Sequence, residues 1–485
     1  MTTLKVLSVA SEAFPLVKTG GLGDVVGALP AALSAEGIET TTMIPGYAEV
    51  IAALENPRLV HSYDYLQGAP AHVLAGRAAG LDLLVLDAPH LFARKGNPYV
   101  APDGADWPDN AQRFAALGVA AADIARGVVP ALATDVVHAH DWQAALAIAF
   151  LHYGGTRRPG TVMTVHNLAF QGQYPASLLS ELGLPEHAFA HDGVEYYGDI
   201  GYLKAGLQLA DRITTVSPTY AAEIRSEEHG MGLHGLLRHR AGVLSGILNG
   251  IDTTVWNSAT DPFLASPYDA RKLGRRAANR IALQTRLGLD VDPNALLVGI
   301  VSRMTWQKGM DLLPDALGAL LAQGGQLAML GSGDFALEQA MMAAAAANPG
   351  RIAVTVGYDE SFAHQIQGGV DALLVPSRFE PCGLTQLCAL RYGTVPIVAH
   401  SGGLADTVID ANEMALAAGV GTGIVFERNS KDALAFAIER AARLHRDAKV
   451  WGGIQRRGMK TDVSWARPAQ QYGALFRQLV AERAG

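Results

Sequence analysis

The sequence predicts two doubly wound α/β domains in tandem. Short apolar runs typical of buried strands alternate with helical patterns, and the alternation starts again after a polar stretch at 258–282. At 485 residues the chain is also too long for one ordinary core, which favours two to three domains. Because parallel sheets bind ligands beyond the carboxyl ends of their strands, two such domains predict a cleft between them.

Composition and charge exclude several classes of protein. The chain is 49% hydrophobic and carries a net charge of −8, so we expect no binding to nucleic acid or to an anionic membrane. The apolar start is too short for a signal peptide and is ended by Glu12, and no apolar run approaches the length of a membrane span. The chain has only two cysteines, Cys382 and Cys388, which is typical of a reducing compartment. We therefore expect a cytoplasmic protein.

The N-terminal half carries the less regular alternation. Apolar runs predict strands at 4–10, 39–44, 81–88, 135–139, 161–165 and 213–216. Helical patterns lie between most of these runs, at 24–36, 111–126 and 142–152.

A glycine-rich loop follows the first strand, from Lys18 to Asp24. Gly20, Gly21 and Gly23 would let backbone amides approach a phosphate, toward which Lys18 adds positive charge. The spacing matches neither the dinucleotide fingerprint nor the P-loop. The other interpretation is a flexible turn in which Asp24 caps the helix.

Two further strands of this half end in polar clusters. His138, His140 and Asp141 follow one strand, and His166 with Asn167 follows the next, at the sheet edge where such folds bind ligands. Two histidines two residues apart suggest a metal ion, but no second cluster supports one, so we expect no metal site. The aromatic segment 170–204 is either a loop that binds flat apolar faces such as sugar rings or an irregular cover over the sheet.

The C-terminal half repeats the alternation more cleanly. Strands are predicted at 295–301, 326–330, 351–357, 371–376 and 395–399, and helices at 310–322, 336–347, 361–368 and 385–392. The tail, 447–485, has a helical pattern that Pro468 should break. We expect domains at 1–245 and 259–457, a hinge at 246–258, and a final segment, 458–485, that returns to the first domain.

Loops at the predicted strand ends of this half carry the candidate chemistry. Arg303 and Lys308 lie in one loop and could reach a single diphosphate. Tyr358 offers a ring on which a base could stack. Glu380 precedes a helix that starts at Thr385, and a helix start binds anions. Since a carboxylate beside an anion site suits hydroxyl groups, the ligand should be a phosphorylated or nucleotide-linked polyol.

Six motifs together resemble one family, the bacterial glycogen synthases of retaining glycosyltransferase family 5, which also holds plant starch synthases. They are KTGGL at 18–22, HAHDW at 138–142, HN at 166–167, NGID at 249–252, SRMTWQKG at 302–309 and SRFEPCGLTQL at 377–387. The resemblance implies a GT-B architecture of two Rossmann-like domains. It also implies glucose transfer from ADP-glucose to the non-reducing 4-hydroxyl of an α-1,4-glucan, with retention and without a metal or other cofactor.

The resemblance also implies a role for each matching residue. The catalytic set is Glu380, Arg303, Lys308, Asp141 and His166. Residues expected to bind ADP-glucose are Lys18, Gly20, Gly21, Asn249, Tyr358, Cys382, Gly383, Leu384 and Thr385. Within these sets the cations neutralise the diphosphate, Glu380 grips glucose hydroxyls, and His166 lies near the primary hydroxyl of the donor glucose.

Other functions remain open on the residues alone. A related GT-B transferase that uses UDP-glucose or another acceptor would share the C-terminal loops. A non-catalytic glucan-binding protein is a second alternative, although every expected charged group is present. An oxidoreductase with two Rossmann domains lacks its glycine fingerprint and downstream acid.

Overall fold

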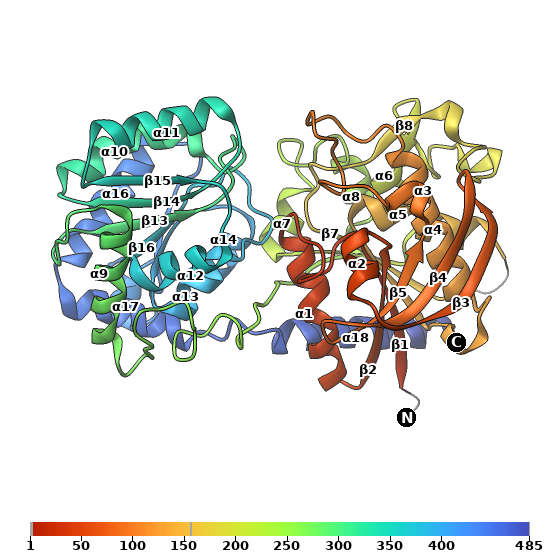
Figure 1. Ribbon diagram of the computed structural model, residues 1–485, viewed down its shortest axis with the longest axis horizontal. Coiled ribbons are helices and arrows are strands. Elements are labelled where there is room, and N and C mark those ends of the chain that lie inside the picture. Colours follow the sequence, from red (N-terminus) through yellow and green to blue (C-terminus); the bar gives the residue numbers. More distant parts are fainter. Residues whose placement is uncertain (1–2, 156–157, 485) are drawn as a thin grey trace. The chain divides into compact units, whose positions relative to one another are not determined.

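The computed structural model describes residues 3–155 and 158–484 and divides the chain into two compact units (Figure 1). The first unit comprises Met1–Asn249 and Trp465–Gly485, and the second is Gly250–Ser464. The chain passes from the first unit to the second after Asn249, which lies within the expected hinge at 246–258. It returns to the first unit at Trp465, seven residues after position 458, where the returning segment was expected to begin. Among the described residues, no helix has both the length and the apolarity that crossing a membrane requires.

A nine-stranded sheet forms the centre of the first unit, in the order β12-β11-β7-β6-β1-β2-β5-β4-β3. All neighbours are parallel except at one end of the sheet, where β4 pairs antiparallel with β5 on one side and with β3 on the other. The bounds are β1 Leu4–Val9, β2 Ile38–Pro45, β3 Glu55–Leu66, β4 Ala69–Ala78, β5 Leu81–Asp87, β6 Val136–His140, β7 Gly160–Val165, β11 Arg212–Thr215 and β12 Leu244–Gly246.

The hairpin of β3 and β4 was not predicted from the sequence. Residues of β3 are mostly exposed, so the strand has no apolar run to reveal it. Gln67 and Gly68 connect the two strands, with φ of 47° and 111°, and positive φ is what a tight hairpin turn requires.

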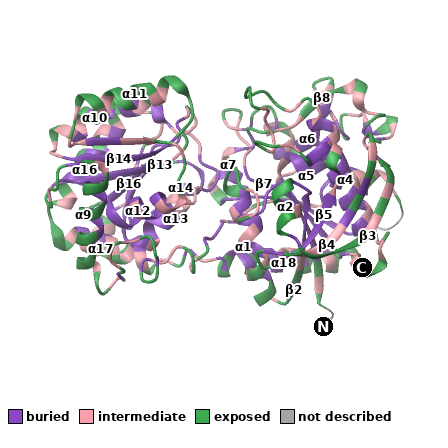
Figure 2. Ribbon diagram, viewed as in Figure 1, coloured by how far each residue is buried: buried purple, intermediate pink, exposed green. Residues whose placement is uncertain are grey.

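Helices cover both faces of this sheet. Buried residues of α1 and α18 pack against Val6 of β1 on one face, whereas α4 and α5, almost wholly buried (Figure 2), pack against Leu7 on the other. Helix α1 begins at Gly21 with Gly20 as its N-cap, so the expectation that Asp24 caps the helix is wrong. The helices are α1 Gly21–Ala35, α2 Ala48–Ala53, α3 Pro89–Phe92, α4 Asn110–Arg126, α5 Asp141–Tyr153, α6 Tyr202–Leu209, α7 Pro218–Glu223, α8 His234–His239 and α18 Ala466–Ala484.

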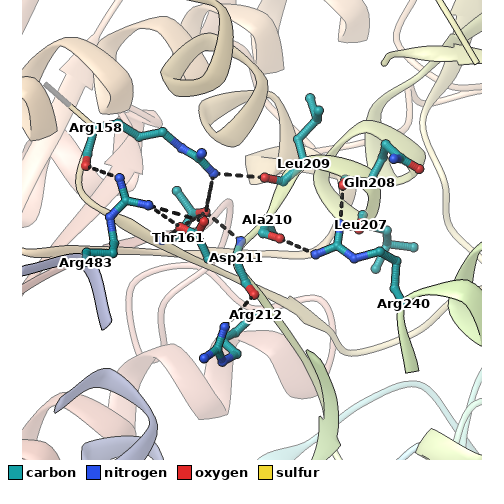
Figure 3. A network of polar contacts seen from close by, with 10 residues as sticks. All are labelled: Arg158, Thr161, Leu207, Gln208, Leu209, Ala210, Asp211, Arg212, Arg240 and Arg483. Atoms are coloured by element: carbon teal, nitrogen blue, oxygen red, sulfur yellow. Dashed lines mark hydrogen bonds and ion pairs between the residues drawn. The ribbon is translucent and has the colours of Figure 1, made fainter. Parts of the chain in front are cut away.

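Helix α18 is the last segment of the chain and belongs to the first unit. Arg483 forms an ion pair with Asp211 at 3.3 Å, as Figure 3 shows, and Arg212 pairs with Glu482. The predicted break in the helical tail lies at 461–465, a few residues before Pro468, which itself stands in the first turn of α18, where the missing N–H costs nothing.

The aromatic segment at 170–204 folds into a small sheet of its own, in the order β8-β10-β9. Its strands are β8 Gln173–Pro175, β9 Glu195–Tyr196 and β10 Asp199–Gly201. Tyr202 is fully buried, whereas Tyr197 is 76% exposed. Part of the segment is therefore a cover, and its binding of sugar rings stays a prediction.

The second unit contains a six-stranded parallel sheet in the order β15-β14-β13-β16-β17-β18. Its strands are β13 Leu297–Val301, β14 Gln326–Gly331, β15 Ile352–Val356, β16 Ala372–Val375, β17 Val395–Ala399 and β18 Ile424–Phe426. Residues that alternate along the strands pack against α10, α16 and α17 on one face and against α9 and α12 on the other.

The helices of the second unit are α9 Arg276–Leu287, α10 Leu313–Ala322, α11 Phe335–Ala347, α12 Glu360–Gly369, α13 Thr385–Tyr392, α14 Gly402–Thr407, α15 Glu413–Ala418, α16 Lys431–His445 and α17 Ala448–Lys460. Helices α10 to α13 lie where the sequence predicts them and α17 lies in the predicted helical tail, whereas α9, α14, α15 and α16 were not predicted. Short 3₁₀ turns complete the chain at Pro130–Leu132, Ala176–Leu178, Glu186–Ala188, Ala241–Val243, Leu273–Arg275 and Met310–Leu312.

Candidate active site

The nine-stranded and the six-stranded sheet each have one point at which the strand order reverses. In the first unit the chain runs outward from β1 in one direction and from β6 in the other, and in the second unit β13 and β16 are the corresponding pair. Loops that follow such a pair diverge and leave a crevice at the carboxyl ends of the strands, where ligands bind. The loops with Lys18 and Asp141, and those with Arg303 and Glu380, lie at these two points.

An ion pair between a buried carboxylate and a half-buried lysine lies at the reversal point of the second unit. Lys308 Nζ is 2.6 Å from Glu380 Oε2, and the Ser377 hydroxyl donates a 2.8 Å hydrogen bond to the same oxygen. The Glu380 backbone N–H donates to Ser401 Oγ, and the residue is only 6% exposed. Within the described chain, Glu380 Oε1 makes no hydrogen bond, so this oxygen is available for a hydroxyl donor.

The two loops that carry this ion pair are fastened to each other. Arg378 forms a bidentate pair with Asp311, at 2.5 and 2.7 Å, and its backbone N–H donates to the Gln307 carbonyl. Gly309, with φ of 68°, lies so close to Pro376 that a Cβ would be 2.1 Å from the Pro376 carbonyl oxygen. The position of Lys308 therefore depends on backbone contact as well as on charge.

Two other predicted residues of the second unit are exposed. The Arg303 side chain forms no ion pair or hydrogen bond within the described chain, so its guanidinium remains available for an anion. Tyr358 lies after β15 with 66% of its surface exposed, and its hydroxyl donates to the Glu360 carboxylate. Its ring can therefore stack on a flat ligand.

The turn from Cys382 to Thr385 leads into α13. Gly383 has φ of 72°, Leu384 is the N-cap, and Thr385 is the first helical residue. Gly403 packs beneath this turn, where its N–H donates to the Glu380 carbonyl and a Cβ would lie 2.2 Å from the Cys382 carbonyl oxygen. The amides at the start of α13 are thereby held in place for an anion.

In the first unit, the glycine-rich loop is organised by a carboxylate. Glu12 is 2% exposed and accepts hydrogen bonds from the Thr19 N–H at 2.6 Å and the Gly20 N–H at 3.3 Å. Lys18 Nζ lies 2.9 Å from an Asp24 carboxylate oxygen. Because the Gly20 amide already has a partner, Lys18 and the amides from Gly21 onward are what this loop offers a diphosphate.

Asp141 begins α5 in a left-handed conformation, with φ of 56°. One carboxylate oxygen accepts the His166 N–H at 2.7 Å and the Asn167 N–H at 3.4 Å. Burial raises the pKa of Asp141 to about 7, although these two hydrogen bonds act in the opposite direction. Asp141 therefore holds the start of the His166 loop.

Imidazole rings are buried in the layer beneath this loop. His140 Nδ1 lies 3.0 Å from His166 Nε2, and His138 Nε2 lies 2.6 Å from Thr164 Oγ1. Burial lowers the pKa of His138 and of His166 to about 3, so both rings are neutral at physiological pH. In the described part of the chain, no three His, Cys, Asp or Glu side chains are grouped to hold a metal ion.

Asn249 is the last residue of the first unit before the chain crosses to the second. It is 8% exposed, and its side-chain oxygen is buried without a hydrogen-bond partner among the described residues. A buried amide oxygen without a partner is unfavourable unless a ligand or water completes it, which suits a residue that binds substrate.

Several residues at these positions have no predicted role. Glu12 supports the glycine-rich loop, Ser377 and Ser401 bond Glu380, and Arg378 fastens two loops. The signal for Glu12 was its place as a carboxylate at the end of an apolar strand. Ser401 and Arg378 have no local signal, because their partners are 21 and 67 residues away in the sequence. Ser377 lies only three residues before its partner Glu380 in the same loop and could have been considered.

Comparison with known proteins adds an independent finding. Residues 5–239 match the family described as "Starch synthase catalytic domain", and residues 285–456 match "Glycosyl transferases group 1". Glycogen synthases of Rhodopseudomonas palustris and Methylocella silvestris are 61% and 60% identical over 483 residues, which covers 100% of this chain and of each relative.

Solved structures agree on the architecture. The catalytic domain of starch synthase IV from Arabidopsis thaliana, bound to ADP and acarbose, is 31% identical with a TM-score of 0.88, covering 99% of this chain and 100% of that one. Sucrose-phosphate synthase from Thermosynechococcus elongatus is 19% identical with a TM-score of 0.61 over 99% and 100%, and so shows the fold alone. The predicted fold class and family are confirmed, and the chain belongs to the glycogen synthase family of glycosyltransferases.

Proposed function

We propose that the chain transfers glucose from ADP-glucose to the non-reducing 4-hydroxyl of an α-1,4-glucan, with retention of configuration and release of ADP. The observation that carries this proposal is the Lys308–Glu380 pair, with the exposed Arg303 in the same loop as Lys308, at the strand-order reversal of the second unit. Two cations and one carboxylate suit a ligand that is anionic at one end and hydroxylated at the other. The names of the relatives and the ADP in the Arabidopsis structure support the same donor.

In the second unit we assign the nucleotide and its phosphates. Arg303 and Lys308 neutralise the charge that develops on the departing diphosphate, which is the role of a metal ion in other phosphate chemistry. We propose that no metal is required for this reason. The amides of Cys382, Gly383, Leu384 and Thr385 contact a phosphate, and the Tyr358 ring stacks on adenine. Glu380 Oε1 accepts hydrogen bonds from the glucose hydroxyls.

In the first unit we assign contacts to the transferred glucose and to the acceptor. His166 and Asn249 hold the glucose, the former at its primary hydroxyl, and Asp141 lies near the reacting centre. Lys18 and Gly21 approach the diphosphate and sugar, and Gly20 joins them only if its amide leaves the Glu12 carboxylate.

Retention requires either a covalent carboxylate intermediate or attack on the face that the leaving group vacates. Glu380 Oε2 is committed to Lys308 and Ser377, and an oxygen of Asp141 is committed to two backbone amides. This favours front-face transfer over a covalent intermediate. The anomeric C–O bond to phosphate breaks, the acceptor 4-oxygen bonds to the same face, and the departing phosphate oxygen takes the acceptor proton.

One assay tests the proposal. Incorporation of radiolabelled glucose into glycogen is measured with ADP-glucose and with UDP-glucose, each with and without a chelator. We expect incorporation from ADP-glucose that the chelator does not change. Preference for UDP-glucose would replace the donor, and dependence on added metal would contradict the metal-free mechanism. Absence of incorporation from both donors would refute the proposed activity.

A further inference from the structure

A chain of buried hydrogen-bonding groups crosses three neighbouring strands of the first unit. Ser8 lies on β1, His140 ends β6, and His166 follows β7 by one residue, and these strands are adjacent in the sheet. Ser8 Oγ is 3.2 Å from His140 Nε2, and His140 Nδ1 is 3.0 Å from His166 Nε2. The three residues are 4%, 1% and 9% exposed. Because burial holds both imidazoles neutral, each ring carries one proton.

Proton counting allows two arrangements of this chain. In the first, the Ser8 hydroxyl donates to His140 Nε2, and His140 Nδ1–H donates to His166 Nε2. In the second, both hydrogen bonds are reversed, and the Ser8 proton then needs another acceptor. Ser8 Oγ has no second hydrogen-bond partner among the described residues. The first arrangement is therefore favoured, since an unpaired buried donor is costly.

We propose that His140, oriented by Ser8, is a positioning residue that holds His166 as the Nδ1–H tautomer, so that the His166 ring donates a hydrogen bond to its ligand. With Nε2 occupied by His140, Nδ1 is the atom left to a ligand, and it has no partner within the described chain. The Asp141 carboxylate fixes the backbone of the same residue through its N–H. Backbone and ring are thus each held by a separate contact.

The identity of that ligand rests on the proposed function. There His166 lies at the primary hydroxyl of the donor glucose, and the oxygen of this hydroxyl accepts the Nδ1–H bond. An N–H donor cannot pair with a methyl group or an ammonium at that carbon. A site built to hydrogen-bond a hydroxyl discriminates strongly against an analogue that lacks it, because its own polar group is then unpaired. His140 therefore contributes to donor specificity without touching the donor.

Nuclear magnetic resonance of the full chain labelled with ¹⁵N-histidine tests the tautomer without substrate. We expect a proton on Nδ1 of both His140 and His166, and a scalar coupling across the hydrogen bond between His140 Nδ1 and His166 Nε2. His166 signals are assigned by their loss in His166→Asn. A proton on Nε2 of His166 in the wild-type chain would overturn the proposal.

Kinetics then separate positioning from simple structural support. His140→Asn keeps an N–H near the position of Nδ1, the atom that contacts His166, whereas His140→Leu keeps no donor there. We expect His140→Leu to lower kcat/KM for ADP-glucose by about 10-fold and His140→Asn to remain within about 3-fold of wild type. Thr42→Val is the matched control, since Thr42 is paired with Ser8 in the sheet and its buried hydroxyl has no partner among the described residues.

A second donor makes the result specific. With ADP-6-deoxyglucose, which lacks the hydroxyl in question, the loss caused by His140→Leu should shrink to less than about 3-fold. An equal loss with both donors would mean that His140 only supports the fold, and would refute the positioning role. If the wild-type chain transfers glucose from no donor, the proposed function fails, while the tautomer and the coupling still decide the state of His166.

Discussion

Removal of Lys308 alone should destabilise the second unit more than removal of Lys308 and Glu380 together. Lys308 and Glu380 side chains are 17% and 8% exposed and lie 2.6 Å apart. Lys308→Met leaves a buried carboxylate for which Ser377 is the one remaining side-chain donor among the described residues. Loss of one member of such a pair costs about 3–5 kcal/mol, and the retained hydroxyl places this case near 3 kcal/mol.

The other two variants complete a thermodynamic cycle. Glu380→Gln keeps the shape and the Ser377 hydrogen bond and leaves a partly hydrated ammonium, so we expect a loss of about 1–3 kcal/mol. The double variant removes both charges, and its stability should lie within about 1 kcal/mol of wild type. Replacing a buried ion pair by neutral groups is often neutral because the desolvation cost disappears with the attraction.

Urea-dependent hydrogen exchange of peptides from β13 and β16 measures these changes within the second unit. Lys431→Met is the control, because its pair with Asp315 is more than 60% exposed on both sides and should contribute less than about 1 kcal/mol. A double variant as unstable as the sum of the two single variants would refute the argument. So would a loss below about 1 kcal/mol for Lys308→Met.

Three more predictions follow from single positions. Arg303→Ala should lower kcat by ~10²-fold. Its stability should change little, because the Arg303 side chain is exposed and unpaired in the described chain. As a control, replacing Arg271, an exposed arginine elsewhere in this unit, by Ala should not change kcat. Asp141→Asn should gain stability relative to wild type as pH rises from about 4 to 8, by at most about 4 kcal/mol. The reason is that burial raises the pKa of the Asp141 carboxyl from 3.8 to about 7, so its ionisation opposes folding of the wild type. Urea midpoints with the same pH dependence in both proteins would contradict this. Gly309→Ala should reduce kcat at least about 10-fold, because the added Cβ displaces the loop. Gly318→Ala, whose Cβ meets open space in a helix, should raise stability by about 0.5–1 kcal/mol. Kinetics and thermal unfolding of both variants check these two outcomes.

Strands with continuous apolar runs could be predicted because burial on both faces of a parallel sheet leaves that trace in the sequence. The run at 372–375 and the helix at 385–392 fall where the pattern places them. The exposed strand β3 left no such trace, and neither did β18, which is only three residues long. The break in the tail was placed at Pro468 and not at 461–465, because a proline that ends a helix and one in a first turn look alike until the helix start is known.

Candidate site residues could be predicted where several polar or charged residues lie together in one loop of the sequence. Glu380 and Thr385 stand in the loop and helix start that follow one strand. The Lys308–Glu380 contact joins residues 72 positions apart, and no local pattern encodes it. The support of Gly20 by Glu12 was missed for a related reason, since the loop folds back on the strand that precedes it.

By itself the sequence determined the alternation of strands and helices, the order of the motifs and the family, because these depend on periodicity and on short runs of residue types. Tertiary structure alone decided which groups meet. It placed Ser8 of β1, His140 of β6 and His166 after β7 in one hydrogen-bonded chain, and it left Arg303 exposed while it buried Glu380. Charge state, tautomer and pairing depend on burial and on distant partners, and packing fixes these only after the sheets have formed.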